Sequence, residues 1–309
     1  MILRPNEMDF SDKNFSMIIS GSPGIGKTTL ALSAPDPVLI DFDKGISRVR
    51  AQHRKTAIVC DTYEEVLKDL DSPEVRQART LVLDTGGAFI TYLQDWAMRD
   101  DPVLNRQKNG AISLKGFGAV KSEFVRFTNM LQYTMNKNII YIFHTIEERD
   151  REITKQRLMC EGAARNIVWQ PCDLGCLIQM VGDKRYCGFS PTEEYFAKGC
   201  YGITGLIEIP ELDASTPNDF LVRLFKRARE NIAAESAQTA QEMQGYEQAM
   251  SAIREIVERI EDAGSAGQAA AEMKKLQHHL TSEREGRALF SARVKELGLV
   301  YNKQEQRYE

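Results

Sequence analysis

The feature that most constrains this chain is a glycine-rich segment near its amino end. Residues 21–28 have the sequence GSPGIGKT and fit the pattern G-x-x-x-x-G-K-[ST] at every position. A β-rich run at 16–20 precedes the segment, and the helix-favouring stretch TLAL at 29–32 follows it. A strand, a glycine-rich loop and a helix in this order are the context that the motif requires. The pattern therefore predicts an α/β fold that binds phosphate where this helix begins, and an ordinary glycine-rich turn is the alternative.

Each residue type in this loop has a physical role. Glycines let the backbone curl so that successive N–H groups point at a phosphate, and the helix adds the partial positive charge of its amino end. Lys27 can reach the β- and γ-phosphates of a nucleotide, and the Thr28 hydroxyl can bind Mg²⁺. The residues that we expect to contact the nucleotide are Gly21, Ser22, Pro23, Gly24, Ile25, Gly26, Lys27, Thr28 and Thr29.

Two acidic residues complete the expected site. The run TLVL at 80–83 suits a buried strand and ends in Asp84, which would hold Mg²⁺ through water beside Thr28. The alternative for Asp84 is an aspartate that only caps a strand end. Thr85 stands where many P-loop enzymes carry a catalytic glutamate, so we look for the catalytic acid elsewhere. Asp43 follows the predicted strand 38–42 at the edge where such sheets bind ligands, and it is the candidate.

Short β-rich runs alternate with helical patterns before residue 210, which predicts a mainly parallel sheet with helices on both faces. Two further runs flank Gly182 and Asp183 and predict a β-hairpin extension over 174–190. The expected parallel strands are 16–20, 38–42, 57–60, 80–84 and 138–144, and the expected helices include 63–70, 89–98 and 117–135.

The remainder of the chain has a helical pattern. The turn-rich stretch 210–217 contains the last of the ten prolines and predicts a domain boundary. We therefore expect a short lead over 1–16, an α/β core over 17–217 and an all-α region over 218–309. Its apolar seam is either a partner or self-association surface or a helical pair packed on the core.

Three signals divide this helical region. Apolar residues spaced by three and four from Met243 to Ile260 predict one amphipathic helix, which the stretch GSAG at 264–267 is expected to break. Ser282 and Glu285 have capping-box spacing and predict the start of a last helix, which Gly298 ends.

With these motifs, the sequence resembles the RecA recombinase family over roughly residues 17–205. The segment LIDFD at 39–43 is similar to the family's strand whose glutamate orients the attacking water, with Asp43 in the glutamate's place. The segment 139–145 resembles the strand that senses the γ-phosphate, with His144 and Thr145 in place of Asn-Gln. The segment 194–198 resembles the strand whose lysine, here Lys198, reaches the ATP of a neighbouring subunit. The short phage-encoded RecA-like ATPases, including the Sak-type single-strand annealing proteins, are the most similar group.

The resemblance implies an ATP- and Mg²⁺-dependent ATPase with a RecA-like core. Its catalytic residues would be Lys27, Asp43, His144 and Lys198, its metal residues would be Thr28 and Asp84, and ATP would lie at the interfaces of a homo-oligomer. Asp43 is one methylene shorter than glutamate, and a catalytic group misplaced by ~1 Å can cost about a hundredfold in rate. We therefore expect slow hydrolysis.

The resemblance also implies two segments that contact single-stranded DNA. They are 106–115 and 146–157, and their candidate phosphate contacts are Arg106, Lys108, Lys115, Arg149, Arg151, Lys155 and Arg157. Without the resemblance, both segments are expected to be solvated loops. The implied function is a phage recombination protein that binds single strands and promotes annealing or strand pairing. The first alternative is an ATP-gated interaction protein that recruits a replication or recombination partner through its helical tail, and the second is a motor or helicase with fast turnover.

Composition excludes several other classes. Forty basic and 44 acidic residues give a net charge of −4, so any nucleic-acid binding must be local. No apolar run approaches the ~18 residues of a membrane span, and the amino end lacks the apolar block of a signal peptide, so we expect a cytoplasmic protein with reduced cysteines. Cysteines 160, 172, 176, 187 and 200 lack paired zinc-finger spacing, and we expect them to be small buried apolar side chains.

Overall fold

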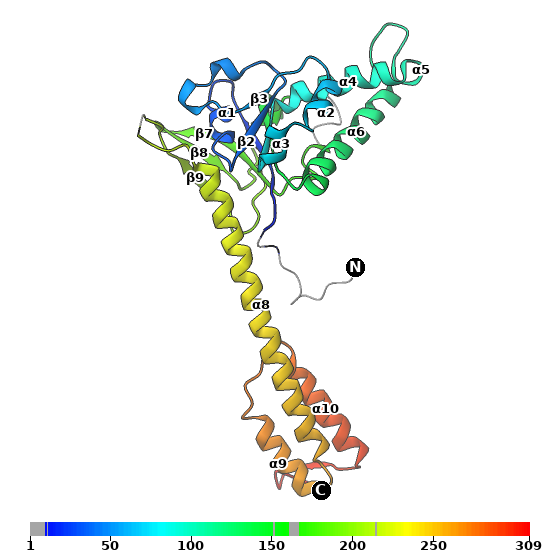
Figure 1. The fold of residues 1–309 in the computed structure, drawn as a ribbon. Helices are drawn as coiled ribbons and strands as arrows, with labels where there is room; N and C mark the ends of the chain where they lie inside the picture. Colours follow the sequence, from blue (N-terminus) through cyan, green and yellow to red (C-terminus); the bar gives the residue numbers. More distant parts are fainter. Residues whose placement is uncertain (1–9, 11, 151, 161–166, 214) are drawn as a thin grey trace. The chain divides into compact units, whose positions relative to one another are not determined.

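The computed structural model describes residues 10, 12–150, 152–160, 167–213 and 215–309 (Figure 1). The chain divides into two compact units, one of residues 12–231 and one whose helices lie within residues 232–309. Each unit is described by itself below. The domain limits expected from the sequence remain predictions.

One mainly parallel sheet forms the centre of the first unit. Among the described residues, its strands lie in the order β3-β2-β4-β5-β1-β7-β8-β9, and β6 pairs with β5. The strands up to β5 and β7 pair in parallel, whereas β6, β8 and β9 are antiparallel additions. The strands are β1 (Ser16–Gly21), β2 (Pro37–Asp41), β3 (Ala57–Ile58), β4 (Thr80–Asp84), β5 (Asn138–Asp150), β6 (Ile153–Leu158), β7 (Leu174–Val181), β8 (Lys184–Gly188) and β9 (Leu206–Ile209).

The strand order confirms the expected RecA-like α/β class. Strand β5 lies between β1, which leads into the glycine-rich loop, and β4, which ends in Asp84. The β7–β8 hairpin that Gly182 and Asp183 predict is also present. One expectation differs, because β5 continues six residues past His144 and folds back as β6. Residues 146–157, expected as a loop, are therefore largely a paired β-ribbon.

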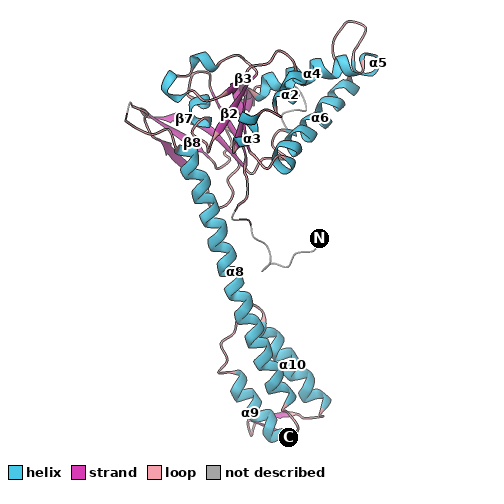
Figure 2. Cartoon of the chain, in the orientation of Figure 1, coloured by secondary structure: helices cyan, strands magenta, loops and turns pink. Residues whose placement is uncertain are grey.

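Helices surround this sheet in chain order (Figure 2). They are α1 (Lys27–Ala31), the 3₁₀ turns η2 (Ile46–Arg48) and η3 (Ala51–His53), α2 (Tyr63–Asp69), α3 (Pro73–Gln77), α4 (Gly86–Asp100), α5 (Pro102–Asn105), α6 (Leu114–Asn129), the π-helical turn η4 (Met130–Thr134) and the first turns of α8 (Phe220–Glu258).

Alternating residues of the parallel strands bury both faces of the sheet, as parallel sheets require. On one face, Leu83 and Tyr141 join an aromatic core with residues of α2, α4 and α6, including Phe89. Their alternate neighbours Val82 and Ile142 are fully buried on the opposite face. Two covered faces fix the sheet, so the loops at its carboxyl edge have a rigid base.

The beginning of α8 docks on the short helix α1. The backbone N–H groups of Leu221 and Val222 donate to the hydroxyl and carbonyl oxygens of Ser33, at 3.0 and 3.1 Å. The Asn218 side chain donates to the Thr29 carbonyl at 2.8 Å. These contacts satisfy N–H groups that have no partner inside α8 itself. The start of α8 and the phosphate-loop helix are thus hydrogen-bonded to each other.

The second unit contains the rest of α8, α9 (Ala263–Met273), α10 (Ser282–Glu296) and a small ribbon of β10 (Tyr301–Asn302) and β11 (Arg307–Tyr308). Its separate apolar core includes Ile253 and Ile260, which belong to the predicted seam. The pattern of helices is confirmed, whereas the terminal ribbon was not expected (Figure 2).

Two local expectations for this unit are wrong. The helix ends before the stretch 264–267, which lies inside α9, because the Asp262 carboxylate and Ser265 form a capping box that starts α9 two residues earlier. Thr281, and not Ser282, is the N-cap residue of α10, and its hydroxyl donates to Glu285 at 2.5 Å. Gly298 follows the end of α10 with a φ of +71°, as expected for a helix stop.

Candidate functional site

The glycine-rich loop curls at the carboxyl end of β1 and leads into α1. Gly24 and Gly26 have φ values of +79° and +98°, which favour residues without a side chain. Gly26 is also the N-cap residue of α1, so the amino end of this helix opens on the loop. The sequence prediction of a strand, loop and helix is therefore confirmed.

A pocket of about 550 Å³ lies over this loop. Its residues come from the loop, from the ends of β2, β4 and β5, and from β8 and the segment after β9. They are Gly24, Gly26, Lys27, Thr28, Thr29, Asp43, Gly45, Arg48, Val49, Arg50, His53, Asp84, His144, Arg185, Glu211 and Leu212. The structure thus brings together all the predicted catalytic and metal residues except Lys198.

Lys27 and His144 contact each other at the base of the pocket. The Lys27 Nζ atom donates to the carbonyl oxygens of Gly21 and Ser22 and lies 3.0 Å from His144 Nδ1. Burial lowers the pKa of Lys27 to about 8, although the Asp84 and Asp43 carboxylates oppose the shift. Burial and the Lys27 charge also lower the pKa of His144. A cation held in so desolvated a place is stabilised when an anion such as phosphate approaches it.

Thr28 and Asp84 form the pair expected of a magnesium site. The Thr28 hydroxyl donates to Asp84 Oδ2 at 2.6 Å. Burial raises the pKa of Asp84 to about 6, and the nearby Asp43 and Asp41 carboxylates raise it further. Three carboxylates that repel one another beside a hydroxyl oxygen are the oxygen-rich surroundings that Mg²⁺ prefers. The residues present therefore fit Mg²⁺.

The two aspartates after β2 have different roles. Both oxygens of Asp41 accept hydrogen bonds at 2.8 Å, from the backbone N–H groups of Gly45 and Ile46, so Asp41 holds the turn. Asp43 lies in the turn itself, where Oδ2 is 3.3 Å from Arg48 and Oδ1 is buried without a hydrogen-bond partner. A buried carboxylate oxygen of this kind is costly unless it acts on a ligand or water. Asp43, as predicted, is the carboxylate that lines the pocket.

Sequence reasoning missed Arg185. Its guanidinium extends from β8 to the glycine-rich loop and donates to the Ile25 carbonyl at 3.3 Å. Arg48 and Arg50, which the sequence left between the nucleotide and the surface, also line the pocket. Only the pairing of the β7–β8 hairpin places Arg185 here, and the sequence pattern predicts that hairpin without predicting which face each residue takes.

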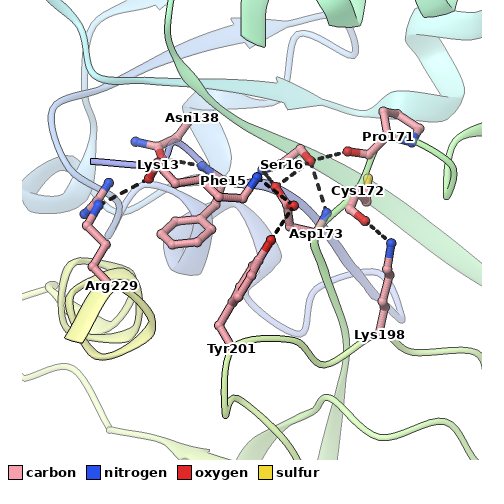
Figure 3. Close-up of polar contacts among 10 residues, drawn as sticks. All are labelled: Lys13, Phe15, Ser16, Asn138, Pro171, Cys172, Asp173, Lys198, Tyr201 and Arg229. Carbon is pink, nitrogen blue, oxygen red and sulfur yellow. Dashed lines mark hydrogen bonds and ion pairs between the residues drawn. The ribbon is translucent and has the colours of Figure 1, made fainter. Parts of the chain in front are cut away.

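Lys198 lies apart from this pocket (Figure 3). It follows an irregular segment where a strand was expected, and its Nζ atom donates to the Cys172 carbonyl. Cys172 precedes β7, whose Leu174 pairs with Met17 at the amino end of β1. Lys198 is therefore at the edge of the sheet opposite the glycine-rich loop of its own chain.

The two predicted DNA segments differ in their ion pairing. In the β5–β6 ribbon, Lys155 pairs with Asp150, and Arg157 lies 3.8 Å from Glu148. Arg149 is also in the ribbon, and Arg151 lies outside the described residues. In contrast, Arg106, Lys108 and Lys115 are exposed, and none forms an ion pair with another described residue.

The cysteines behave as expected from their spacing. Cys172, Cys176 and Cys187 are buried, and burial raises the pKa of the Cys172 and Cys176 thiols. Within the described residues, no group of three or more His, Cys, Asp or Glu side chains has the arrangement of a metal cluster.

No helix in the described part of the chain has the length and apolarity needed to cross a membrane. In comparisons with known proteins, a family model described as "AAA domain" matches residues 13–201. Among solved structures, the flagellar accessory protein FlaH from Methanocaldococcus jannaschii is similar at 10% identity, with a TM-score of 0.32, over 64% of this chain and 90% of that chain. A search of curated proteins found no match.

Proposed function

This chain belongs to the AAA domain family, and we propose that its P-loop ATPase domain binds ATP with Mg²⁺ in the pocket over residues 21–29 and hydrolyses it slowly. The observation that carries the proposal is the convergence of Lys27, the Thr28–Asp84 pair and Asp43 on one pocket. These are the cation, the metal residues and the acid that phosphoryl transfer needs, and each comes from a different strand end.

The side chains divide the work. Lys27 and the N–H groups of the loop bind the phosphate oxygens, and Thr28 and Asp84 hold Mg²⁺, which when bound neutralises charge on the phosphates. Asp43 Oδ1, which is buried without a partner, accepts a hydrogen bond from the attacking water and orients it. His144 can exchange its contact with Lys27 for one with phosphate. Because Asp43 is short, we expect slow turnover, with ATP serving partly as a conformational switch.

Isothermal titration calorimetry with ATP and Mg²⁺, followed by a steady-state phosphate-release assay, tests this proposal. Wild type should bind ATP, and Asp84→Asn should lose the magnesium dependence of binding because it removes the metal-side carboxylate. Asp183→Asn, in the exposed β7–β8 turn, is the matched control. Folded wild-type protein that takes up no ATP, with or without Mg²⁺, would contradict the proposal.

We further propose that the ATP-bound protein binds single-stranded DNA through residues 106–117, as a recombination protein of the phage RecA-like type. The support is local chemistry: Arg106, Lys108 and Lys115 are exposed and form no ion pair within the described residues. Phe117 is 40% exposed nearby and offers a ring for base stacking. The β5–β6 ribbon contributes less, since Lys155 and Arg157 are held by their own acidic neighbours.

Fluorescence anisotropy with a labelled oligonucleotide tests the DNA proposal in the presence of ATP, ADP or neither. Replacing Arg106, Lys108 and Lys115 with glutamine should weaken binding and lower the salt slope by about 2, since each single-strand phosphate contact contributes about 0.7. Replacing Lys155 and Arg157 with glutamine is the matched control and should have a smaller effect. Absence of binding in every nucleotide state at low salt would remove the DNA role.

One observation favours a second function, that of an ATP-gated interaction protein. The unit of residues 232–309 has a core of its own and still exposes apolar side chains, namely Leu280, Leu289, Val300 and Tyr301. Such side chains suit a replication or recombination partner. Binding of a purified partner that depends on ATP and is lost in Val300→Asp, while DNA binding is absent, would favour this function.

A further inference from the structure

Arg185 occupies the middle of a three-stranded antiparallel ribbon. It lies on β8 opposite Met180 of β7 and opposite Ile209 of β9, so both neighbours in the sheet fix its backbone. Side chains alternate along a strand. Lys184 and Tyr186, on either side of Arg185, both contact Glu208 at 2.8 and 3.3 Å. They therefore occupy one face of the ribbon, and Arg185 extends from the other.

On that other face, the guanidinium reaches the glycine-rich loop. Its Nη1 atom donates to the Ile25 carbonyl at 3.3 Å, and a Cβ atom on Gly26 would lie only 2.5 Å from it. The absence of a side chain at Gly26 thus leaves the space that the guanidinium fills. Arg185 shares the wall of the pocket with Lys27, Thr28 and Thr29.

The charge of Arg185 lacks an acidic partner. Both cross-strand neighbours, Met180 and Ile209, are apolar, and in the described chain no carboxylate forms an ion pair with Arg185. Arg48, on the opposite side of the pocket, is by contrast paired with Asp43. A half-buried guanidinium whose only polar contact is one long hydrogen bond to a carbonyl has donors to spare for an anion.

We propose that Arg185 is a phosphate-binding residue, supplied within the same chain by the β7–β8 hairpin, that grips the phosphate chain of the nucleotide beside the glycine-rich loop. The inference rests on the proposed ATP site and adds a second cation to Lys27. The planar fork of arginine matches phosphate oxygens in a bidentate way that an ammonium group cannot reproduce. The nucleotide is thereby tied to the hairpin as well as to the loop.

Calorimetry on the full chain tests this inference with Arg185→Gln, Arg185→Lys and the control Lys184→Gln. The probes are ATP with Mg²⁺ and inorganic tripolyphosphate with Mg²⁺. Arg185→Gln should weaken both by roughly 10- to 100-fold, since a charge-assisted hydrogen bond contributes about 1.5–3 kcal/mol. Arg185→Lys should recover part of the loss, and Lys184→Gln, on the opposite face, should bind as wild type does.

The outcomes separate this inference from the ATP proposal. Wild type that binds neither probe overturns both. Wild type that binds ATP, with Arg185→Gln within twofold of it, overturns the role of Arg185 alone. A loss for ATP without a loss for tripolyphosphate also overturns it, because Arg185 would then contact the nucleoside. Thermal unfolding of each variant without nucleotide identifies a folding defect, and in that case Arg185→Lys decides: tripolyphosphate affinity equal to wild type overturns the proposal.

Discussion

The two edges of the central sheet differ in how their polar groups are satisfied. At the amino edge, Asp173 accepts hydrogen bonds from the Ser16 backbone and hydroxyl and from Tyr201, and it forms an ion pair with Lys13 at 2.9 Å (Figure 3). At the carboxyl edge, Asp43 Oδ1 is buried without a partner, and the pKa of Asp84 is raised by burial. Both edges carry aspartate, but only one saturates it.

This difference separates structural residues from functional ones. Buried polar groups of a folded protein are usually hydrogen-bonded, and exceptions mark places where something else binds. The Asp173 group joins the amino end of β1 to the start of β7 and to the segment that holds Tyr201. We therefore expect substitutions at the amino edge to reduce stability and substitutions at the carboxyl edge to reduce nucleotide chemistry.

Asp173→Ala should have the largest effect. Removing the carboxylate leaves Lys13 and the Ser16 N–H without their partner, and breaking such a group costs about 3 kcal/mol of unfolding free energy. Urea denaturation followed by circular dichroism measures the loss, and Asp183→Ala in the exposed turn is the control. ATP affinity of the folded fraction should not change, and a selective loss of ATP binding would contradict the contrast between the edges.

Asp43→Asn should lower the rate of ATP hydrolysis by about a hundredfold, because the amide cannot accept a proton from water in the same way. ATP affinity should remain within a few-fold of wild type, and stability should not fall, since Oδ1 has no hydrogen bond to lose. Phosphate release under single-turnover conditions and urea denaturation measure the two quantities. Unchanged hydrolysis would remove Asp43 from the mechanism.

Lys198→Met tests whether the amino edge has a function across a subunit interface. If Lys198 acts on the ATP of a neighbouring copy, the variant should lose roughly tenfold in hydrolysis at high protein concentration, as removal of one charged contact implies. At concentrations where the chain is monomeric, wild type and variant should have equal rates. Equal rates at every concentration would assign Lys198 only to its contact with the Cys172 carbonyl.

His144→Gln should give the smallest effect, and it depends on pH. Burial and Lys27 lower the pKa of His144, so the ring is neutral near pH 7, and a bound triphosphate would raise that pKa again. Proton uptake on binding means that wild-type ATP affinity should increase by about two- to threefold relative to the variant as pH falls from 7.5 to 6. Parallel pH profiles of wild type and His144→Gln would show that His144 does not sense the phosphate.

Motifs with local geometry were predictable from the sequence. The strand before the glycine-rich loop, the loop and Asp84 each depend on neighbouring residues, and the structure has them where the pattern places them. Arg185 and the β5–β6 ribbon were not predictable in this way. Arg185 reaches the loop only because β8 pairs with β7, and register is set by packing that a local pattern does not contain.

Capping explains the misplaced helix break. Glycine disfavours the interior of a helix by about 1 kcal/mol, which led to the expectation of a break at 264–267. The capping box of Asp262 and Ser265 stabilises a helix start by a similar amount, and Ala266 and Ala269 are buried in the core of the unit. Burial and the cap together outweigh the glycines, so the chain turns before them.

The docking of α8 on α1 has a consequence for how the chain can be shortened. A helix of only five residues is far too short to persist by itself in water, yet α1 must hold Lys27 and Thr28 in position. Ser33 and Thr29 gain that support from residues 218–222, almost two hundred positions later in the chain. A fragment truncated after β9 would keep every motif residue but lack this clamp, so the smallest fragment able to grip a nucleotide has to include the opening turns of α8.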